Sequence, residues 1–313
     1  MNKAASRPSV SPLLAFAWGI LAVSSGSILA RQALQYASPL VVSAYRLGIA
    51  TLILLPLVLI RSSQELRALR REWILAVLSG VFLAFHFATW ISSLVYTTVA
   101  SSVVLVSTAP LWVALFAPLF LREGIRKGTV VGMILALGGT VLVGLSESCR
   151  SGAGRLQCPP WDEFFGAQAL WGGFLALLGG LLAAGYLLVG RFLRARHSLL
   201  TYIFTVYGVA ALVLLVWVGM TGLPLFNYPP PAFGWFLALA ILPQLFGHST
   251  FNWALRYVPT ALVSIALLGE PLGSTLLAYL FLNETPSGLQ MIGGGLILSG
   301  LVIASFHQKG DLG

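Results

Sequence analysis

Two stretches of the chain repeat one pattern: STAPLWVALFAPLFLREGIRKGTVVGMILALGGTVLVG at residues 107–144 and LGEPLGSTLLAYLFLNETPSGLQMIGGGLILSG at residues 268–300. A shift of 161 residues places Pro110 on Pro271. The same shift pairs Glu123 with Glu284, Tyr96 with Tyr257, Ala100 with Ala261, Gly132 with Gly293, Gly139 with Gly300, Gly19 with Gly180 and Thr89 with Thr250. A constant offset over this distance predicts a chain built from two copies of one unit.

Both stretches are apolar, and so is the whole chain. Hydrophobic residues make up 58% of the 313 residues, charged residues only 9%, and the mean hydropathy is +0.91. An ordinary soluble domain has roughly a quarter of its residues charged. This chain lacks the polar surface of a soluble protein, so we expect lipid to surround most of it. The same figures exclude a disordered chain, a collagen-like repeat and a disulfide scaffold.

Ten apolar runs follow one another along the chain, and each is close to the roughly 20 residues that a helix needs to cross a bilayer. They are expected at Pro12–Ala30, Pro39–Ile60, Trp73–Ser92, Thr98–Phe120, Thr129–Leu145, Ala169–Val189, Thr201–Met220, Ala232–Trp253, Thr260–Phe281 and Leu289–Phe306. The first run could also be a cleaved signal peptide, but the repeat requires it as a helix. The predicted fold is therefore an all-α membrane protein with ten transmembrane helices.

The basic residues are distributed unevenly among the loops between these runs. Of the 18 lysines and arginines, fourteen fall in the N-terminal segment, the even-numbered loops and the C-terminal tail, and three fall in the odd-numbered loops. Cytoplasmic loops are enriched in Lys and Arg, so both termini are predicted to be cytoplasmic. The net charge of +9 then reflects topology, and nucleic acid is not expected as a partner.

Each half of the chain holds five runs, and five is odd, so the second half enters the membrane from the opposite side. Such inverted repeats are common in alternating-access transporters. The expected units are a first five-helix repeat at 1–147, an outward-facing loop at 148–168, a second five-helix repeat at 169–306 and a cytoplasmic tail at 307–313. Within the fifth run small residues recur every four positions, which predicts a face that another helix can approach closely. They are Gly128, Gly132, Ala136, Thr140 and Gly144.

The two quoted stretches, each with a proline, a glutamate and then glycines, resemble the drug/metabolite transporter superfamily in its EamA-type form. The resemblance covers nearly the whole chain. It implies a secondary transporter of small metabolites in the bacterial inner membrane, and no enzyme. Within the superfamily the chain is most similar to bacterial exporters of aromatic amino acids and related metabolites, which implies export of amino acids. The loop at 146–168 is longer than the resemblance implies.

Two charged side chains fall inside the apolar runs, Arg46 and Glu270. A charge at the centre of a membrane helix costs about 2.5–3.5 kcal/mol on insertion scales, so each is expected to face a wet cavity or a partner. Arg46 would bind a substrate carboxylate, and Glu270 an amino group or a proton. The alternative is that both only satisfy backbone groups freed at the proline breaks.

Further polar and aromatic side chains recur at helical spacing. Gln244, His248 and Asn252 are four residues apart in the eighth run, which places them on one helix face. His86 and Trp90 form a similar pair in the third run, the repeat partner of the eighth. The alternative role for these side chains is interhelical hydrogen bonding. With Arg46 and Glu270, the expected substrate-binding residues are His86, Trp90, Gln244, His248, Asn252, Trp18 and Trp112.

Pro110 and Pro271 hold matching places in the fourth and ninth runs. Proline lacks a backbone N–H and clashes with the preceding turn, so it kinks a helix. Two symmetry-related kinks are predicted to act as hinges, and a static kink is the alternative.

Both cysteines, Cys149 and Cys158, fall in the predicted outward loop. An oxidising compartment would allow them to form a disulfide, but the sequence leaves open whether they are bonded. Two cysteines without a nearby histidine do not favour a metal site.

Several motifs are missing from the sequence, and their absence limits the possible functions. It contains no GxxxxGK[ST], HExxH or GxSxG motif, and both aspartates, Asp162 and Asp311, lie outside the runs. No ATP, cofactor, metal or catalytic residue is therefore expected. The predicted function is export of small metabolites, most simply amino acids, by alternating access at a cavity near the membrane midplane.

The driving force would be the substrate gradient or protons. The alternatives are a nucleotide-sugar or drug carrier of the same superfamily and a lipid-modifying membrane enzyme. The expected partners are the lipid bilayer and a small-molecule substrate. A monomer is compatible with the sequence, which does not determine the oligomeric state.

Overall fold

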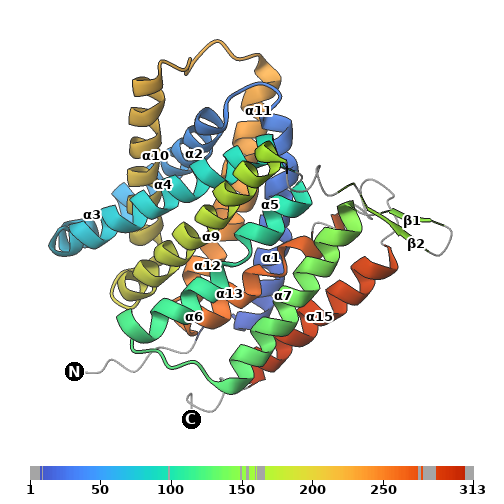
Figure 1. The fold of residues 1–313 in the computed structure, drawn as a ribbon. Helices are drawn as coiled ribbons and strands as arrows, with labels where there is room; N and C mark the ends of the chain where they lie inside the picture. Colours follow the sequence, from blue (N-terminus) through green and yellow to red (C-terminus); the bar gives the residue numbers. More distant parts are fainter. Residues whose placement is uncertain are drawn as a thin grey trace.

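The structure is a computed structural model of the chain. The residues it describes are 8, 10–97, 99–148, 150–152, 155–158, 160, 166–273, 276–277 and 287–306. The long helices are α1 (Pro12–Ala33), α2 (Pro39–Arg61), α4 (Trp73–Tyr96), α7 (Lys127–Ser148), α9 (Ala167–Arg194), α10 (Leu199–Thr221) and α15 (Gly288–Phe306) (Figure 1). The shorter segments are α3 (Ser63–Leu69), the 3-10 turn η1 (Arg70–Glu72), α5 (Val99–Val106), α6 (Ala109–Phe120), α11 (Pro230–Leu239), the π-helix η2 (Ala240–His248), α12 (Ser249–Ala254) and α13 (Thr260–Leu267).

Local sequence signals set several helix ends. Helices α1 and α2 each begin with a proline, Pro12 and Pro39, at a position where the missing N–H leaves no helical bond unmade. Helix α10 begins after Ser198, whose hydroxyl accepts a hydrogen bond from the backbone N–H of Thr201. It ends at Gly222, which has a positive φ of 69°, a conformation that glycine adopts without steric cost.

The helices are long and apolar enough for a membrane protein. Over the described residues, seven helical stretches could cross a bilayer by length and composition, and three shorter apolar helices cover residues 127–142, 260–273 and 291–304. Each of the ten predicted apolar runs overlaps one of these stretches. The prediction of a helical membrane protein is confirmed, and the exact number of crossings stays a prediction.

The outside of the helix bundle is apolar, whereas polar groups lie inside. Leu52 on α2 is 67% exposed and Ile134 on α7 is 62% exposed, while Ser43 is fully buried. Lipid cannot hydrogen-bond a polar group, so polar side chains must find partners within the protein. Ser43 does so by donating a hydrogen bond from Oγ to the carbonyl oxygen of Pro39, 2.8 Å away.

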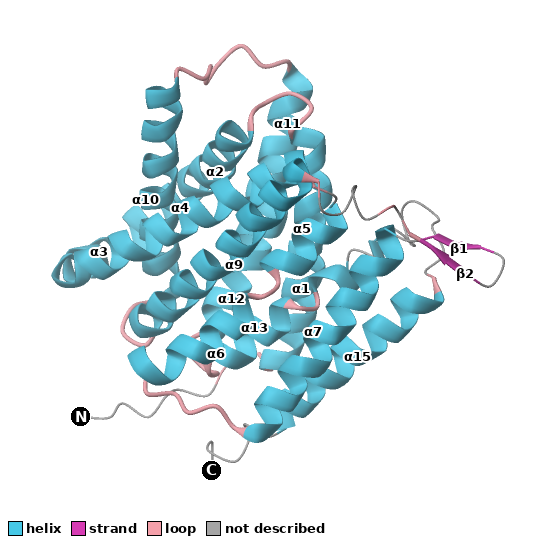
Figure 2. Ribbon diagram, in the orientation of Figure 1, coloured by secondary structure: helices cyan, strands magenta, loops and turns pink. Residues whose placement is uncertain are grey.

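The predicted loop at 148–168 holds a pair of β-strands, the only strands among the described residues. Strands β1 (Arg150–Gly152) and β2 (Arg155–Gln157) pair antiparallel, with Arg150 opposite Gln157 (Figure 2). The described residues keep the predicted all-α fold, and this short hairpin lies within the loop predicted at 148–168. The segment lacks an apolar stripe that could pack as a helix, and two extended pieces satisfy each other's backbone groups instead.

Cys158 follows β2 directly and is disulfide-bonded. Cys149, the other cysteine of the chain, lies outside the described residues, so their pairing stays a prediction.

The loops gather at two ends of the bundle. At one end Glu65 accepts hydrogen bonds from the backbone N–H and the hydroxyl of Ser198, which joins the α2–α4 connection to the α9–α10 loop. At the other end the hydroxyl of Tyr45 donates to the carbonyl oxygen of Leu225. We call the first end, rich in arginine, the basic end. It contains the loops at 62–72, 121–126, 195–198 and 255–259.

Helices α7 and α15, the last helix of each repeat, lie side by side along one edge of the bundle (Figure 1). Gly132 meets the backbone of Gly300, and Gly139 meets the backbone of Gly293. The offset of 161 exchanges these two contacts, as an inverted repeat requires. The small face predicted for the fifth run is the face that allows this approach.

Replacing Gly139 with alanine is expected to destabilise the α7–α15 pair. The added Cβ would lie 2.5 Å from the carbonyl oxygen of Gly293, and overpacking of this kind costs about 1–3 kcal/mol. Gly138→Ala is the matched control, because nothing lies within 4 Å of a Cβ built there. Thermal unfolding in detergent measures both variants, and equal stability would contradict close backbone packing at this seam.

Candidate functional site

Two helix breaks at symmetric places define the centre of the molecule. Helix α5 ends at Val106 and α6 begins at Ala109, with a turn between them. Helix α13 ends at Leu267, and the chain is helical again from 270 to 273. The two breaks are 161 residues apart, like the rest of the repeat. Discontinuous membrane helices of this kind mark binding sites in many transporters.

The prolines sit just after these breaks and do not kink a continuous helix. Pro110 is the second residue of α6, and Pro271 is the second residue of the helical segment that follows the other break. At such a position the missing N–H costs no hydrogen bond. The expectation of kinks centred on the prolines is corrected, because each proline instead begins a new helical segment.

Pro110→Ala is expected to slow transport while changing substrate affinity less. Alanine supplies an N–H that can donate to the Val106 carbonyl, which favours a continuous, stiffer helix across the break. Pro271→Ala should act in the same way. Pro118→Ala, inside α6 and away from the break, is the control. Transport rate at saturating substrate and binding affinity measured separately in liposomes test this, and a wild-type rate in both variants would remove the support for a hinge.

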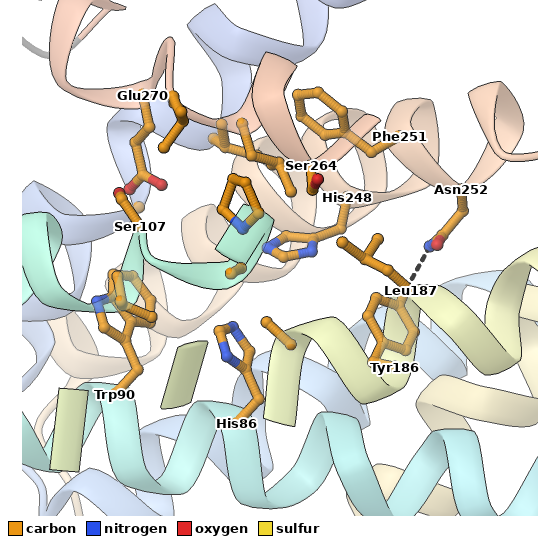
Figure 3. A pocket seen from close by; sticks show the side chains of 18 of the residues that line it. His86, Trp90, Ser107, Tyr186, Leu187, His248, Phe251, Asn252, Ser264 and Glu270 are labelled. Carbon is orange, nitrogen blue, oxygen red and sulfur yellow. Dashed lines mark hydrogen bonds between the residues drawn. The ribbon is translucent and has the colours of Figure 1, made fainter. Parts of the chain in front are cut away.

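A cavity lies beside the two breaks and has a volume of about 60 Å³. Its polar and aromatic lining consists of Arg46, His86, Trp90, Ser107, Tyr186, His248, Phe251, Asn252, Ser264 and Glu270 (Figure 3). Pro110 also lines it. Typical ligand pockets measure roughly 300–1,000 Å³, so this cavity must widen before a substrate can enter.

Arg46 is held rigidly at the cavity. The side chain is 1% exposed, its Nε donates to Oε1 of Gln244 at 2.8 Å, and its guanidinium carbon lies 4.0 Å from the centre of the Phe87 ring. One guanidinium nitrogen, Nη1, is buried and has no hydrogen-bond partner among the described residues. A buried, unpaired charged donor is costly, so a ligand oxygen would be stabilised there.

Glu270 is the acidic group of the cavity. It is the first residue of the helical segment after the second break, and its carboxylate points towards Ser107 (Figure 3). Glu270 interacts electrostatically with Arg46, but the two do not form an ion pair within 4.0 Å. Among the described residues, none donates a hydrogen bond to this carboxylate. The cavity therefore offers a cation and an anion that are not bonded to each other.

Aromatic rings form one wall of the cavity. His86 and Trp90 both rise from α4, with ring planes 5° apart and centres 6.2 Å apart (Figure 3). His86 Nδ1 lies 2.9 Å from the carbonyl oxygen of Gly179. A carbonyl only accepts hydrogen bonds, so a neutral His86 carries its proton on Nδ1 and leaves Nε2 as an acceptor. The ring centres of His248 and His86 are 6.4 Å apart. Trp90 Nε1 is buried and has no hydrogen-bond partner among the described residues.

Three of the expected binding residues do not line the cavity. Gln244 is fully buried behind Arg46 and holds it. Trp18 is 57% exposed and packs edge-on against Phe246 of the second repeat, at the outer surface of the bundle. Trp112 is partly buried in α6 and is not part of the lining, although its Nε1 has no partner. The sequence alone could not separate these three residues from the six that line the cavity, because that distinction depends on how each helix is oriented in the bundle.

Two buried tyrosines bonded to Asn252, Tyr186 and Tyr207, escaped the sequence analysis. Asn252 donates from Nδ2 to the hydroxyl of Tyr186 at 2.5 Å (Figure 3). It also donates to the hydroxyl of Tyr207 at 3.2 Å. Tyr207 in turn lies 3.2 Å from the hydroxyl of Ser249. A buried tyrosine hydroxyl needs a hydrogen-bond partner. A tyrosine in the middle of an apolar run was therefore the sequence signal that could have predicted this polar cluster.

The eighth predicted run is not a regular α-helix. It consists of α11, the nine-residue π-helix η2 and α12, and the π-helix carries Gln244 and His248. Proline at 243 lies inside it. π-helical turns are rare and often occur at functional sites, and this one brings Gln244 to Arg46 and His248 to the cavity.

Comparison with known proteins agrees with this architecture. The sequence profile of the EamA-like transporter family matches residues 10–145 and 170–306. The chain belongs to the EamA-like transporter family. It is therefore a membrane transporter and not an enzyme.

Relatives of this EamA-like transporter carry the same function in their names. An uncharacterized transporter of Archaeoglobus fulgidus is 28% identical over 243 residues, which cover 76% of this chain and 78% of that protein. The pseudopaline exporter CntI of Pseudomonas aeruginosa is 25% identical over 247 residues, which cover 78% and 79%. A crystal structure of a protein with 21% identity superposes with a TM-score of 0.75 over 96% of this chain and 98% of that one, a likeness that shows the fold alone.

Proposed function

We propose that this EamA-like transporter exports amino acids, with aromatic ones as the preferred class, by alternating access at the cavity beside the two helix breaks. The chain crosses the bacterial inner membrane ten times as two inverted five-helix repeats. The basic end, which gathers the arginine-rich loops, faces the cytoplasm.

The observation that carries this proposal is the pair of unbonded opposite charges in one cavity. Arg46 keeps a buried, unpaired donor, and Glu270 keeps a carboxylate without a described partner. An α-amino acid carries a carboxylate and an ammonium group and can satisfy both. The stacked rings of His86 and Trp90 form a flat wall that suits a planar side chain.

The relative named as a pseudopaline exporter supports export as the direction of transport. A nucleotide sugar carries two phosphates and calls for several cationic groups, whereas Arg46 is the single arginine among the described residues that line the cavity. The amino-acid proposal therefore has more support than the nucleotide-sugar alternative.

Uptake into proteoliposomes across a panel of amino acids, with and without a pH gradient, tests the proposal. Aromatic amino acids should be transported, and their matching amines without a carboxylate should not. Transport of nucleotide sugars or uncharged drugs with no transport of any amino acid would overturn the assignment.

The orientation is tested by a single cysteine introduced at Arg67 or at Asn227, on opposite ends of the bundle. An impermeant thiol reagent added to intact cells should label only the variant at 227. Labelling at 67 would reverse the orientation.

A further inference from the structure

Glu123 joins three helices at the basic end, and its role is not explained by the cavity. Its Oε1 accepts a hydrogen bond from Nε of Arg191 at 2.7 Å, and its Oε2 accepts one from the backbone N–H of Thr260 at 3.0 Å. Arg191 also donates to the carbonyl oxygen of Leu255. Glu123 belongs to the first repeat, whereas its two partners, Arg191 and Thr260, belong to the second.

These partners lie at the ends of the helices that form the cavity. Glu123 follows α6, Arg191 lies in the last turn of α9, and Thr260 is the first residue of α13. Helices α6 and α13 run from the two breaks beside the cavity to the basic end. At 1.5 Å per residue they span about 18 Å and about 12 Å, so this contact holds their far ends together.

The backbone next to Glu123 adopts a strained conformation. Arg122, between α6 and Glu123, has a φ of 57°, in the left-handed region where the Cβ of a non-glycine residue crowds the following carbonyl oxygen. The glycine of the same segment is Gly124, where no positive φ occurs. A strained residue persists only where the surroundings hold it, and here the bonds of the next residue, Glu123, provide that hold.

We propose that Glu123, Arg191, the Leu255 carbonyl and the Thr260 N–H form a latch that keeps the cavity closed towards the basic end. The cavity is too narrow for a substrate, and α6, α9 and α13 contact one another directly. Opening towards the basic end requires α6 to separate from α9 and α13, and that motion breaks the latch. Glu123 is thus a gating residue that sets the balance between closed and open states, and the inference rests on the proposed alternating access.

The test measures access to the cavity without using any substrate. A cysteine replaces Ser264, which lines the cavity, and an impermeant thiol reagent is added to inside-out vesicles. Labelling of the peptide that contains residue 264 is quantified by mass, so the native cysteines can remain. The variants Glu123→Gln and Arg191→Gln are compared with the Ser264→Cys protein in which the latch is unaltered. Arg191→Lys is added because it keeps the positive charge.

Loss of the partly exposed ion pair between Glu123 and Arg191 should raise the labelling rate of residue 264 on the order of fivefold. In Arg191→Lys the labelling rate should stay near that of the unaltered latch. Arg196→Gln is the matched control. It breaks the ion pair of Arg196 with Glu72 at the same end, an exposed pair that touches neither α6 nor α13. Only protein that remains monodisperse in detergent is counted.

An unchanged rate in both Glu123→Gln and Arg191→Gln would overturn the latch, and so would an equal rise in Arg196→Gln. The outcome is independent of the substrate. If amino acids are not transported but labelling rises as expected, the latch stands and only the proposed substrate falls.

Discussion

Replacing Glu270 with glutamine is expected to abolish amino-acid transport, or its response to pH, while leaving the fold intact. Glutamine has nearly the same shape and can still accept a hydrogen bond, so the variant removes only the charge and the titratable proton. A hydrogen bond to a charged group contributes about 1.5–3 kcal/mol, which is roughly a 10- to 150-fold change in affinity. Glu270 faces the cavity and has no described partner that would compensate.

The measurement is transport against pH in liposomes at equal incorporation of wild type and Glu270→Gln. Glu65→Gln at the basic end is the control, since Glu65 binds Ser198 and lies far from the cavity lining. Overlapping curves for wild type and Glu270→Gln would refute a charge-dependent role and leave Arg46 as the group that recognises a charged substrate.

Replacing Arg46 with glutamine should weaken binding of substrates that carry a carboxylate by a similar factor, roughly 10- to 150-fold. The reason is the loss of the unpaired donor Nη1. The discriminating comparison is between an amino acid and the amine that lacks its carboxylate. Affinity for the amine should change little, because no carboxylate contact is lost.

Arg31→Gln is the control for Arg46→Gln, because Arg31 is an exposed arginine outside the cavity lining. Binding of both ligands is measured on purified protein. An equal loss of affinity for amino acid and amine would mean that Arg46 only supports the packing of Gln244 and Phe87, which contact it directly.

The sequence predicted those parts of the structure that depend on the spacing of residues within a helix and on the 161-residue offset between the two repeats. The repeat of 161 residues located both helix breaks to within about two residues, since a proline tends to stand at the start of a new helical segment. Glycines four residues apart predicted the close face of α7. Charged residues inside apolar runs identified Arg46 and Glu270, because a charge in lipid needs a wet surface or a partner.

The remaining features depend on contacts that no single segment contains. The outward face of Trp18 follows from how α1 packs against the second repeat, and nearly every side of α1 is apolar. Gln244 lies behind Arg46 because of the π-helix, whose changed pitch does not show in residue spacing. Glu123 matched Glu284 in the repeat, but its partners Arg191 and Thr260 are 68 and 137 residues away. Glu284 lies outside the described residues.

The small cavity volume also has a consequence for ions. About 60 Å³ has room for a few water molecules at most, and a metal ion or chloride would have to lose most of its hydration to pass. Such dehydration is costly in a medium of low dielectric constant. In this conformation the cavity is therefore too small to hold an ion together with its full hydration shell.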